Sequence, residues 1–350
     1  MDHELHSEVD VEKTALWSVG EEQEKYTLIL GQAIEQYLED LRSLERQIAG
    51  GQMSDDAILG EIVSRTDGIL KICAQYEQEV KDEAAVKATR SYFRKRTHPI
   101  LSKSYAINRI RTWPQGYQGD HLTLEAAYRN APMSDGIGFY LDKYLQDWPL
   151  AHALRGRIAQ LTHLLREELA NRKNPRVLDI ACGSCREIVN LVPDIKSSGA
   201  SVMCVDLDED ALAFSESRLS FADVTPGSIS FRKFNALRLF DLDIAKAEFG
   251  RQDIIYSVGY FDYLPDDFLV KLLRSLYLML NQGGKLIAAF KDAERYRSQE
   301  YHWIADWDGF LQRTPKQFER LLGEAGIPGH AMTISRDRSG IIIFYTAKKE

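Results

Sequence analysis

The sequence predicts an α/β fold: a mostly parallel, doubly wound sheet closed by an antiparallel hairpin, with an α-helical domain before it. Three observations predict this class. From Pro175 onward, short apolar runs of strand length alternate with helical patterns. Near the end of the chain, two further apolar runs flank a polar turn, as in a hairpin. Before residue 148, in contrast, apolar residues recur at the alternating three and four spacing of amphipathic helices.

Length and charge narrow the class of protein. The chain has 350 residues, of which 44% are hydrophobic, enough for an ordinary interior in about two domains. Of its 52 acidic and 44 basic residues, 12 and 4 lie in residues 1–50, so the formal charge of −8 belongs to that stretch alone. An acidic balance argues against a nucleic-acid partner. No run reaches the roughly 18 apolar residues of a membrane span, and the N-terminus has no secretory pattern, so we expect a cytoplasmic protein.

Changes in charge and in apolar periodicity along the chain predict its division into domains. We expect an acidic, loosely ordered arm over residues 1–25, a helical domain over 26–147, and a cofactor-binding catalytic domain over 148–350. Gly50-Gly51 ends the first long helix, and Ser54 with two acids after it has the pattern of an N-cap. Such a helical half serves as a bundle, as a lid over a site, or as the surface of a homodimer.

The remaining elements follow from apolar periodicity and from turn residues. We expect further helices near Asp120 and over residues 134–146, 149–170, 186–194, 209–221 and 266–280. The expected parallel strands cover 176–182, 201–207, 228–234, 253–259 and 285–290, and the hairpin pairs 331–335 with 341–347.

The first strand and the loop after it are the most informative stretch. LDIACGSCRE places Asp179 at a strand end, followed by small residues and a helix start. In such folds ligands bind beyond the carboxyl ends of the strands, where small residues let the backbone approach them. The next strand ends at Asp206, whose carboxylate can accept hydrogen bonds from both hydroxyls of a ribose. The neighbouring Leu207 can pack on an adenine.

Two cofactors could use this geometry, and the loop favours one of them. A nicotinamide cofactor places its pyrophosphate on a G-x-G-x-x-G loop. Here only Gly183 is a glycine, and the charge of Asp179 would repel the phosphates. S-adenosylmethionine has no phosphate and carries an ammonium and a sulfonium, which an acid favours. We therefore expect S-adenosylmethionine as the cofactor.

Cys182 and Cys185 spell C-x-x-C, which has two other interpretations. A redox pair normally opens a helix in a thioredoxin-like unit. Two cysteines are half a zinc site, and no nearby histidine completes it. Because these residues already fill a cofactor loop, we expect no metal here, and four cysteines in all are too few for a disulfide framework.

The same residues carry a family resemblance. DIACGSC resembles motif I of class I S-adenosylmethionine-dependent methyltransferases, usually D-x-G-x-G-x-G, with Ala181 and Cys185 where glycines are usual. Over residues 100–350, RTWPQGYQGD, YRN, LDIACGSCRE and YSVGYFDYLPD resemble the bacterial methyltransferases that make the methyl ester of 3-hydroxypalmitic acid. The resemblance implies their Rossmann-like, seven-stranded sheet with a terminal antiparallel hairpin.

The resemblance also implies the residues of the site. The cofactor would contact Arg111, Gly116, Tyr117, Asp179, Ala181, Gly183, Asp206, Leu207, Asn235, Ala236, Ser257 and Gly259. The acceptor would contact Tyr128, Tyr140, Tyr260, Phe261, Asp262, Tyr263, His302 and Trp303. Tyr117 and His302 are the candidate catalytic residues. Asp262 could equally cap the helix after it, Tyr128 and Tyr140 could pack within the helical half, and a lone histidine is often structural.

The chemistry favours one class of acceptor. A carboxylate is ionised at neutral pH and needs no base, whereas an amine or a hydroxyl usually needs one. The fourth strand lacks the N-P-P-Y or D-P-P-Y motif of amine and amide methylases. The sequence therefore predicts a small-molecule methyltransferase that forms methyl esters of hydroxy or fatty acids. The alternatives are N-methylation of an amino-acid-like metabolite and a non-catalytic scaffold that binds S-adenosylmethionine.

Overall fold

The computed structural model describes residues 21–350, so most of the expected acidic arm lies outside the described residues. The chain divides into two compact units. Of the described residues, the helical unit contains 21–119 together with Asn130–Asp147 and Arg297–Asp308. The sheet unit contains Asp120–Arg129, Trp148–Tyr296 and Gly309–Glu350. Each unit is therefore built from three separate segments of the chain. The sequence had suggested a single boundary after residue 147.

The helical unit is built from long amphipathic helices. Its helices are α2 (Glu21–Ala49), α3 (Asp55–Glu79), α4 (Glu83–Leu101), α5 (Tyr105–Thr112), α7 (Gly136–Gln146) and the π-helical turn η3 (Glu300–Ile304). The Ser54 side chain accepts a hydrogen bond from the backbone N–H of Ala57, as its N-cap pattern predicts. Helix α4 starts separately from α3, because the Asp82 side chain accepts hydrogen bonds from the N–H groups of Ala84 and Ala85 and caps a new helix.

The sheet unit has seven strands in the order β3-β2-β1-β4-β5-β7-β6. Strands β1 to β5 run parallel, and β7 is antiparallel to both of its neighbours, β5 and β6. This confirms the predicted fold class, including the terminal hairpin. The strands are β1 (Arg176–Ile180), β2 (Ser201–Asp206), β3 (Ile229–Lys233), β4 (Gln252–Val258), β5 (Leu280–Lys291), β6 (Met332–Arg336) and β7 (Ile342–Lys348).

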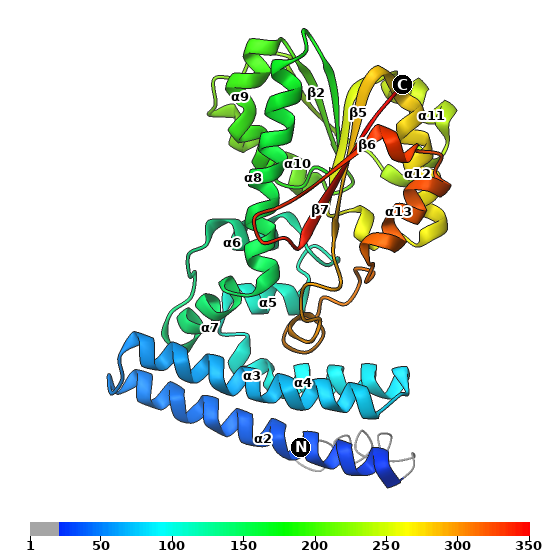
Figure 1. Cartoon of the computed structure of the whole chain (residues 1–350). Coiled ribbons are helices and arrows are strands. Elements are labelled where there is room, and N and C mark those ends of the chain that lie inside the picture. The colour runs from blue at the N-terminus through cyan, green and yellow to red at the C-terminus, as the bar shows by residue number, and fades with distance from the viewer. Residues whose placement is uncertain (1–20) are drawn as a thin grey trace, which may run out of the picture. The chain divides into compact units, whose positions relative to one another are not determined.

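Helices cover both faces of this sheet, which is why its strands read as continuous apolar runs. In Figure 1, α8 (Pro149–Ala170), α9 (Arg186–Ser198) and α10 (Glu209–Ser220) lie on one face, and α11 (Leu242–Phe249), α12 (Asp266–Met279) and α13 (Pro315–Glu324) on the other. The unit also contains α6 (His121–Arg129) and the short turns η1 (Ala236–Phe240), η2 (Phe261–Tyr263) and η4 (Gly329–Ala331). Its core includes Leu178, Ile255 and Leu286, each at most 1% exposed.

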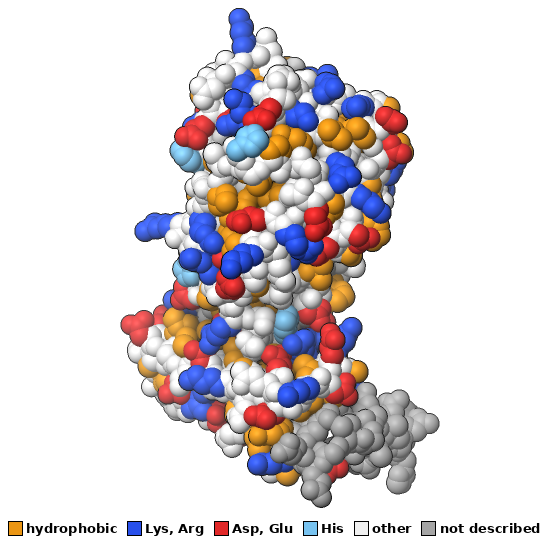
Figure 2. Space-filling view, turned by 45° about the vertical axis from the view of Figure 1, so that its right-hand side comes forward, with side chains coloured by type: hydrophobic (Ala, Val, Ile, Leu, Met, Phe, Trp, Pro, Cys, Tyr) orange, Lys and Arg blue, Asp and Glu red, His pale blue; other side chains and the backbone are white. Residues whose placement is uncertain are grey.

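The surface shows both signs of charge. On the face seen in Figure 2, basic and acidic side chains are interspersed, and no large area carries one sign alone. Within residues 21–350, no helix combines the length and the apolar character that crossing a membrane would require.

Candidate functional site

The loop between β1 and α9 lies where the strand order reverses, the usual ligand site of open α/β sheets. Ala181, Gly183 and Cys185 all have positive φ angles, of 55°, 53° and 46°. This left-handed conformation explains why glycines are usual at these places in motif I. A Cβ built on Gly183 would meet no heavy atom within 4 Å, so the loop backbone borders open space.

Asp206 ties the end of β2 to this loop. Its Oδ2 accepts a hydrogen bond from the Gly183 N–H at 2.8 Å, and its Oδ1 accepts one from the Asp208 N–H at 3.0 Å. Each carboxylate oxygen retains a second lone pair for a ligand hydroxyl. Burial raises the pKa of Asp206, although the backbone hydrogen bonds oppose this shift. The next residue, Leu207, is 58% exposed, an apolar side chain left free beside the carboxylate.

Glu125 of α6 also holds the loop, a role that the sequence did not suggest. Its carboxylate accepts hydrogen bonds from Ser184 at 2.8 Å and from Arg186 at 3.0 Å, and it pairs with Arg218 at 2.6 Å. Burial alone would raise the pKa of Glu125, but the hydrogen bonds from Arg218 and Ser184 hold it below its ordinary value. The segment Asp120–Arg129, which the sequence placed in the helical domain, thus belongs to the sheet unit and supports the loop after β1.

A buried arginine, Arg157 of α8, lies beside the carboxyl end of β4, and the sequence did not suggest it. The Ser257 hydroxyl donates to the Ile180 carbonyl at 2.7 Å and joins β4 to β1. Beyond it, Gly259 has a φ of 104°, and a Cβ there would lie 2.9 Å from Nη1 of Arg157. Arg157 of α8 donates to the Tyr128 hydroxyl at 2.7 Å, while its buried Nε has no hydrogen-bond partner among the described residues.

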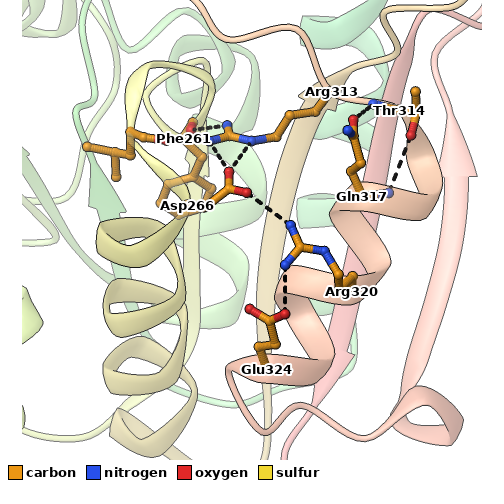
Figure 3. A network of polar contacts seen from close by, with 8 residues as sticks. Phe261, Asp266, Arg313, Thr314, Gln317, Arg320 and Glu324 are labelled. Carbon is orange, nitrogen blue, oxygen red and sulfur yellow. Dashed lines mark hydrogen bonds and ion pairs between the residues drawn. The ribbon is translucent and has the colours of Figure 1, made fainter.

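The segment after β4 is fixed by ion pairs. Figure 3 shows Arg313 donating to the Phe261 carbonyl and to the carboxylate of Asp266, which also pairs with Arg320 of α13. The carboxylate of Asp262 neither caps α12 nor stands free, because it pairs with buried Lys291. Of the predicted acceptor residues here, Phe261 is fully buried, and Tyr260 and Tyr263 are partly exposed.

The other predicted residues lie in two places. Asn235 is the N-cap of η1, where its Oδ1 accepts the Leu237 N–H at 3.0 Å, and Ala236 follows it in the sheet unit. The remaining six belong to the helical unit: Arg111, Gly116, Tyr117, Tyr140, His302 and Trp303.

Within the helical unit, three of these side chains have partners of their own. Arg111 donates to the Ile304 carbonyl at 2.7 Å and to the Thr97 hydroxyl at 3.0 Å. The Tyr140 hydroxyl donates to Asp55 at 2.7 Å. The Trp303 indole donates to a carboxylate and is fully buried. The Tyr117 side chain is 41% exposed.

The residues of the sheet unit fit S-adenosylmethionine. The space above Gly183 can admit a ligand, and Asp206 offers acceptors for ribose hydroxyls beside the exposed Leu207. The loop has none of the paired glycines that a pyrophosphate requires.

Comparison with known proteins agrees with this fit. Residues 178–286 match a family model described as a methyltransferase domain. Such a domain uses S-adenosylmethionine, which is therefore the cofactor of this protein.

Several solved structures are similar to this chain at low sequence identity. A protein from Bordetella parapertussis, described as a possible exported protein, is 16% identical with a TM-score of 0.55, over 91% of this chain and 96% of its own. Magnesium protoporphyrin IX methyltransferase from Synechocystis PCC 6803 with bound SAH is 14% identical with a TM-score of 0.44, over 57% and 86%. A methyltransferase from Clostridium acetobutylicum ATCC 824 is 14% identical with a TM-score of 0.38, over 55% and 90%. No curated protein sequence matches the chain.

His302 is expected to make the methyltransferase less stable in acid. Burial, and then the charge of Arg90, lower the pKa of His302 to about 4, with Glu77, Asp308 and Arg94 as its other charged neighbours. In an unfolded chain the pKa is about 6.5. Between about pH 6.5 and pH 4, the His302 imidazole is therefore protonated in the unfolded chain but not in the folded chain. The free energy of unfolding falls with pH over this range. By pH 4.5 this loss is about 2 kcal/mol.

Denaturant unfolding at pH 7 and pH 4.5 measures this effect. The wild-type protein should lose about 2 kcal/mol more between the two pH values than His302→Gln, which has no imidazole to protonate. Carboxylates elsewhere titrate equally in both proteins and cancel in the difference. Equal losses in the two proteins would mean that His302 titrates alike in the folded and unfolded chains.

Proposed function

We propose that this methyltransferase transfers the methyl group of S-adenosylmethionine to the carboxylate of a small hydroxy or fatty acid. The observation that carries the proposal is the hydrogen bond between the end of β2 and the loop after β1. The Gly183 N–H donates to Asp206, and the exposed Leu207 follows Asp206 in the chain. S-adenosylmethionine, when bound, supplies a methyl group on a sulfonium, which is a good leaving group. The protein then has mainly to hold and align two molecules.

Most of the predicted site residues of the sheet unit have a proposed role. Asp206 would accept hydrogen bonds from the ribose, Leu207 would pack on the adenine, and Asn235 with Ala236 would border its edge. Ala181 and Gly183 would approach the methionine part through their backbone. Ser257 and Gly259 would place Tyr260 and its neighbours beside the methyl group. From the helical unit, Arg111, Gly116 and Tyr117 stay predictions for the cofactor, and Tyr140 and His302 for the acceptor. The fully buried Trp303, also predicted for the acceptor, is instead proposed as a packing residue.

Two features of the described residues support a carboxylate acceptor. Arg157 presents a positive charge and an unused donor beside Gly259, at the end of β4. Guanidinium groups bind carboxylates through directed, charge-assisted hydrogen bonds. The predicted base, His302, has its pKa lowered to about 4, far from the near-neutral value that general base catalysis requires. An acceptor that is already ionised needs no such base.

Calorimetry and product analysis test the proposal in two steps. The full chain is titrated with S-adenosylmethionine and with S-adenosylhomocysteine, and binding of neither would defeat the methyltransferase assignment. The protein is then incubated with labelled S-adenosylmethionine and a panel of hydroxy and fatty acids, and the products are identified by mass spectrometry. Methyl esters are expected. Methylated amines in a parallel panel, with a rate that rises with pH, would favour the N-methyltransferase alternative instead.

Arg157→Lys is expected to raise the KM for the acid about tenfold, because a point charge replaces a fork of directed donors at a cost of about 1.4 kcal/mol. The affinity for S-adenosylmethionine should change by less than about twofold. Arg155→Lys, a neighbouring arginine on α8 that is only half-buried, is the matched control. A tenfold loss of cofactor affinity with an unchanged KM would assign Arg157 to the methionine carboxylate.

The remaining expectations stay predictions. They are the cytoplasmic location, the homodimer through the helical unit, and the membership of the family that makes the methyl ester of 3-hydroxypalmitic acid. Sedimentation of the purified chain tests the homodimer. Inclusion of 3-hydroxypalmitic acid in the acid panel tests the membership of that family.

A further inference from the structure

Three buried cysteines meet under the cofactor loop. Cys182 and Cys185 belong to the loop and Cys204 to β2, and their exposed fractions are 8%, 1% and 0%. The ligand atoms of Asp179, Cys182 and Cys185 all lie within 4.8 Å of one another. Three groups that can bind a metal ion therefore lie together, and Cys204 is the register partner of Asp179 on the neighbouring strand.

The fold brings these groups together through two local features. Asp179 and Cys204 are register partners in the parallel strands β1 and β2, so their side chains leave the same face of the sheet. The Cys185 N–H donates to the Cys182 carbonyl at 3.0 Å and closes a turn that brings the two loop thiols to that face. The sequence offered only the C-x-x-C pair, because the strand register that adds Cys204 and Asp179 was not known.

One atom of the cluster lacks a partner. Oδ2 of Asp179 is buried and accepts no hydrogen bond from any described residue. A buried carboxylate oxygen without a partner is costly, and in proteins such groups are usually satisfied by hydrogen bonds or by metal ions. Buried Glu187, which accepts the Tyr256 hydroxyl at 3.0 Å, is a second acid close to Asp179. Asp179 therefore offers an unused, buried oxygen beside the thiols.

We propose that Cys182, Cys185, Cys204 and Asp179 form a structural site for a soft divalent cation, best filled by Zn²⁺. Three thiols and a carboxylate are a donor set that suits zinc and excludes magnesium or calcium, which prefer oxygen ligands alone. A zinc–sulfur distance of about 2.3 Å separates tetrahedral ligand sulfurs by about 3.8 Å. The ligand atoms of Asp179, Cys182 and Cys185 already lie within 4.8 Å of one another, so side-chain shifts of about 1 Å bring these three to that geometry.

Binding has a defined chemistry and a defined consequence. Zn²⁺ displaces the protons of the thiols it binds, so the site releases protons as it fills. Four protein ligands close the coordination shell and leave no position for a substrate. The ion would hold β1, β2 and the cofactor loop together from below, while the loop backbone around Gly183 borders open space for the cofactor. The site thus stabilises the loop and takes no part in methyl transfer.

The first test uses the full wild-type chain and Zn²⁺ alone. Protein purified with a thiol reductant is incubated with Zn²⁺, separated from free ion, and analysed for metal, with about one zinc per chain expected. Replacement by Co²⁺ should give the intense thiolate-to-cobalt absorption and the visible bands of a tetrahedral site. Absence of bound zinc together with absence of these bands would overturn the proposal.

Alanine variants locate the site. Cys204→Ala should weaken zinc binding at least tenfold in competition with a chromophoric chelator, because it removes one of three thiolate ligands. Cys73→Ala is the matched control, since Cys73 is equally buried but lies in the helical unit. Equal zinc affinity in the two variants would refute the assignment. If Cys204→Ala fails to fold, the cobalt spectrum of the wild-type chain still decides.

The redox interpretation is the competing outcome. Peptide mapping without reductant could find a disulfide between Cys182 and Cys185 in protein that takes up no zinc after reduction, and this would replace the metal site by a thiol pair. Neither the metal analysis nor the peptide mapping depends on methyltransferase activity. Failure of the metal site would leave the calorimetric test with S-adenosylmethionine intact, and failure of the methyltransferase proposal would leave zinc binding intact.

Discussion

Asp206→Ala is expected to weaken the binding of S-adenosylmethionine by more than tenfold. The variant removes the acceptors proposed for the ribose hydroxyls and the partner of the Gly183 N–H, which lies 2.8 Å from Oδ2. Hydrogen bonds to charged groups contribute about 1.5–3 kcal/mol each, and a tenfold change is about 1.4 kcal/mol, so loss of one such bond suffices. Isothermal titration calorimetry of the full chain with S-adenosylmethionine measures the change.

Two further variants separate the ribose contact from a general effect of charge. Asp206→Asn keeps an oxygen acceptor for Gly183 but loses the negative charge, so its affinity should fall between those of the wild type and of Asp206→Ala. Asp223→Ala removes a carboxylate whose side chain is 88% exposed and which pairs with Lys196, and it should bind as the wild type does. A folded Asp206→Ala protein with unchanged affinity would remove Asp206 from the cofactor site.

The sheet could be predicted because burial on both faces leaves a simple pattern. Each parallel strand is a nearly continuous apolar run, and the acids Asp179 and Asp206 stand at the points where two of these runs end. The start of α8 at Pro149 was also clear, since proline is favoured in the first turn of a helix. Shorter elements such as α11 and α13 lack a long stripe, and the sequence did not separate them from loops.

The side chains that the sequence missed are those whose role depends on distant partners. Glu125 and Arg157 read as ordinary charged residues of amphipathic helices, yet both are buried, and Glu125 is 93 residues from Arg218. Local periodicity carries no information about such pairs. The thiol cluster shows the same limit, because C-x-x-C was visible while the register between β1 and β2 was not.

The division into units was obscured for a related reason. Residues 120–129 have a helical pattern like the rest of the first half, but Glu125 and Tyr128 make their contacts with the sheet unit. Residues 297–308 follow the fifth strand of the sheet in sequence, but they pack in the helical unit. Which core a short segment joins is decided by tertiary packing, which its own sequence specifies weakly.

Trp303→Ala is expected to cost about 3–5 kcal/mol of stability, the usual loss for a large buried aromatic side chain. The Trp303 ring is fully buried and packs edge-on against Tyr76 and Phe93, with centroids 6.1 Å and 5.7 Å away. Its indole N–H donates to Glu77 at 2.8 Å, so truncation leaves both a cavity and a less satisfied carboxylate. Denaturant unfolding followed by circular dichroism measures the loss.

Matched variants show whether Trp303 fixes the segment or contacts the acceptor. Trp303→Phe keeps most of the ring packing and loses the hydrogen bond, so it should cost about 1–2 kcal/mol. Phe221→Ala removes an aromatic side chain that is 89% exposed, and it should change stability by less than about 0.5 kcal/mol. Because the indole of Trp303 lies inside the helical unit, Trp303→Phe should leave the KM for the acid unchanged. A Trp303→Phe protein with wild-type stability and a raised KM would instead put the indole against the acceptor, since only a ligand contact alters KM without altering the free energy of unfolding.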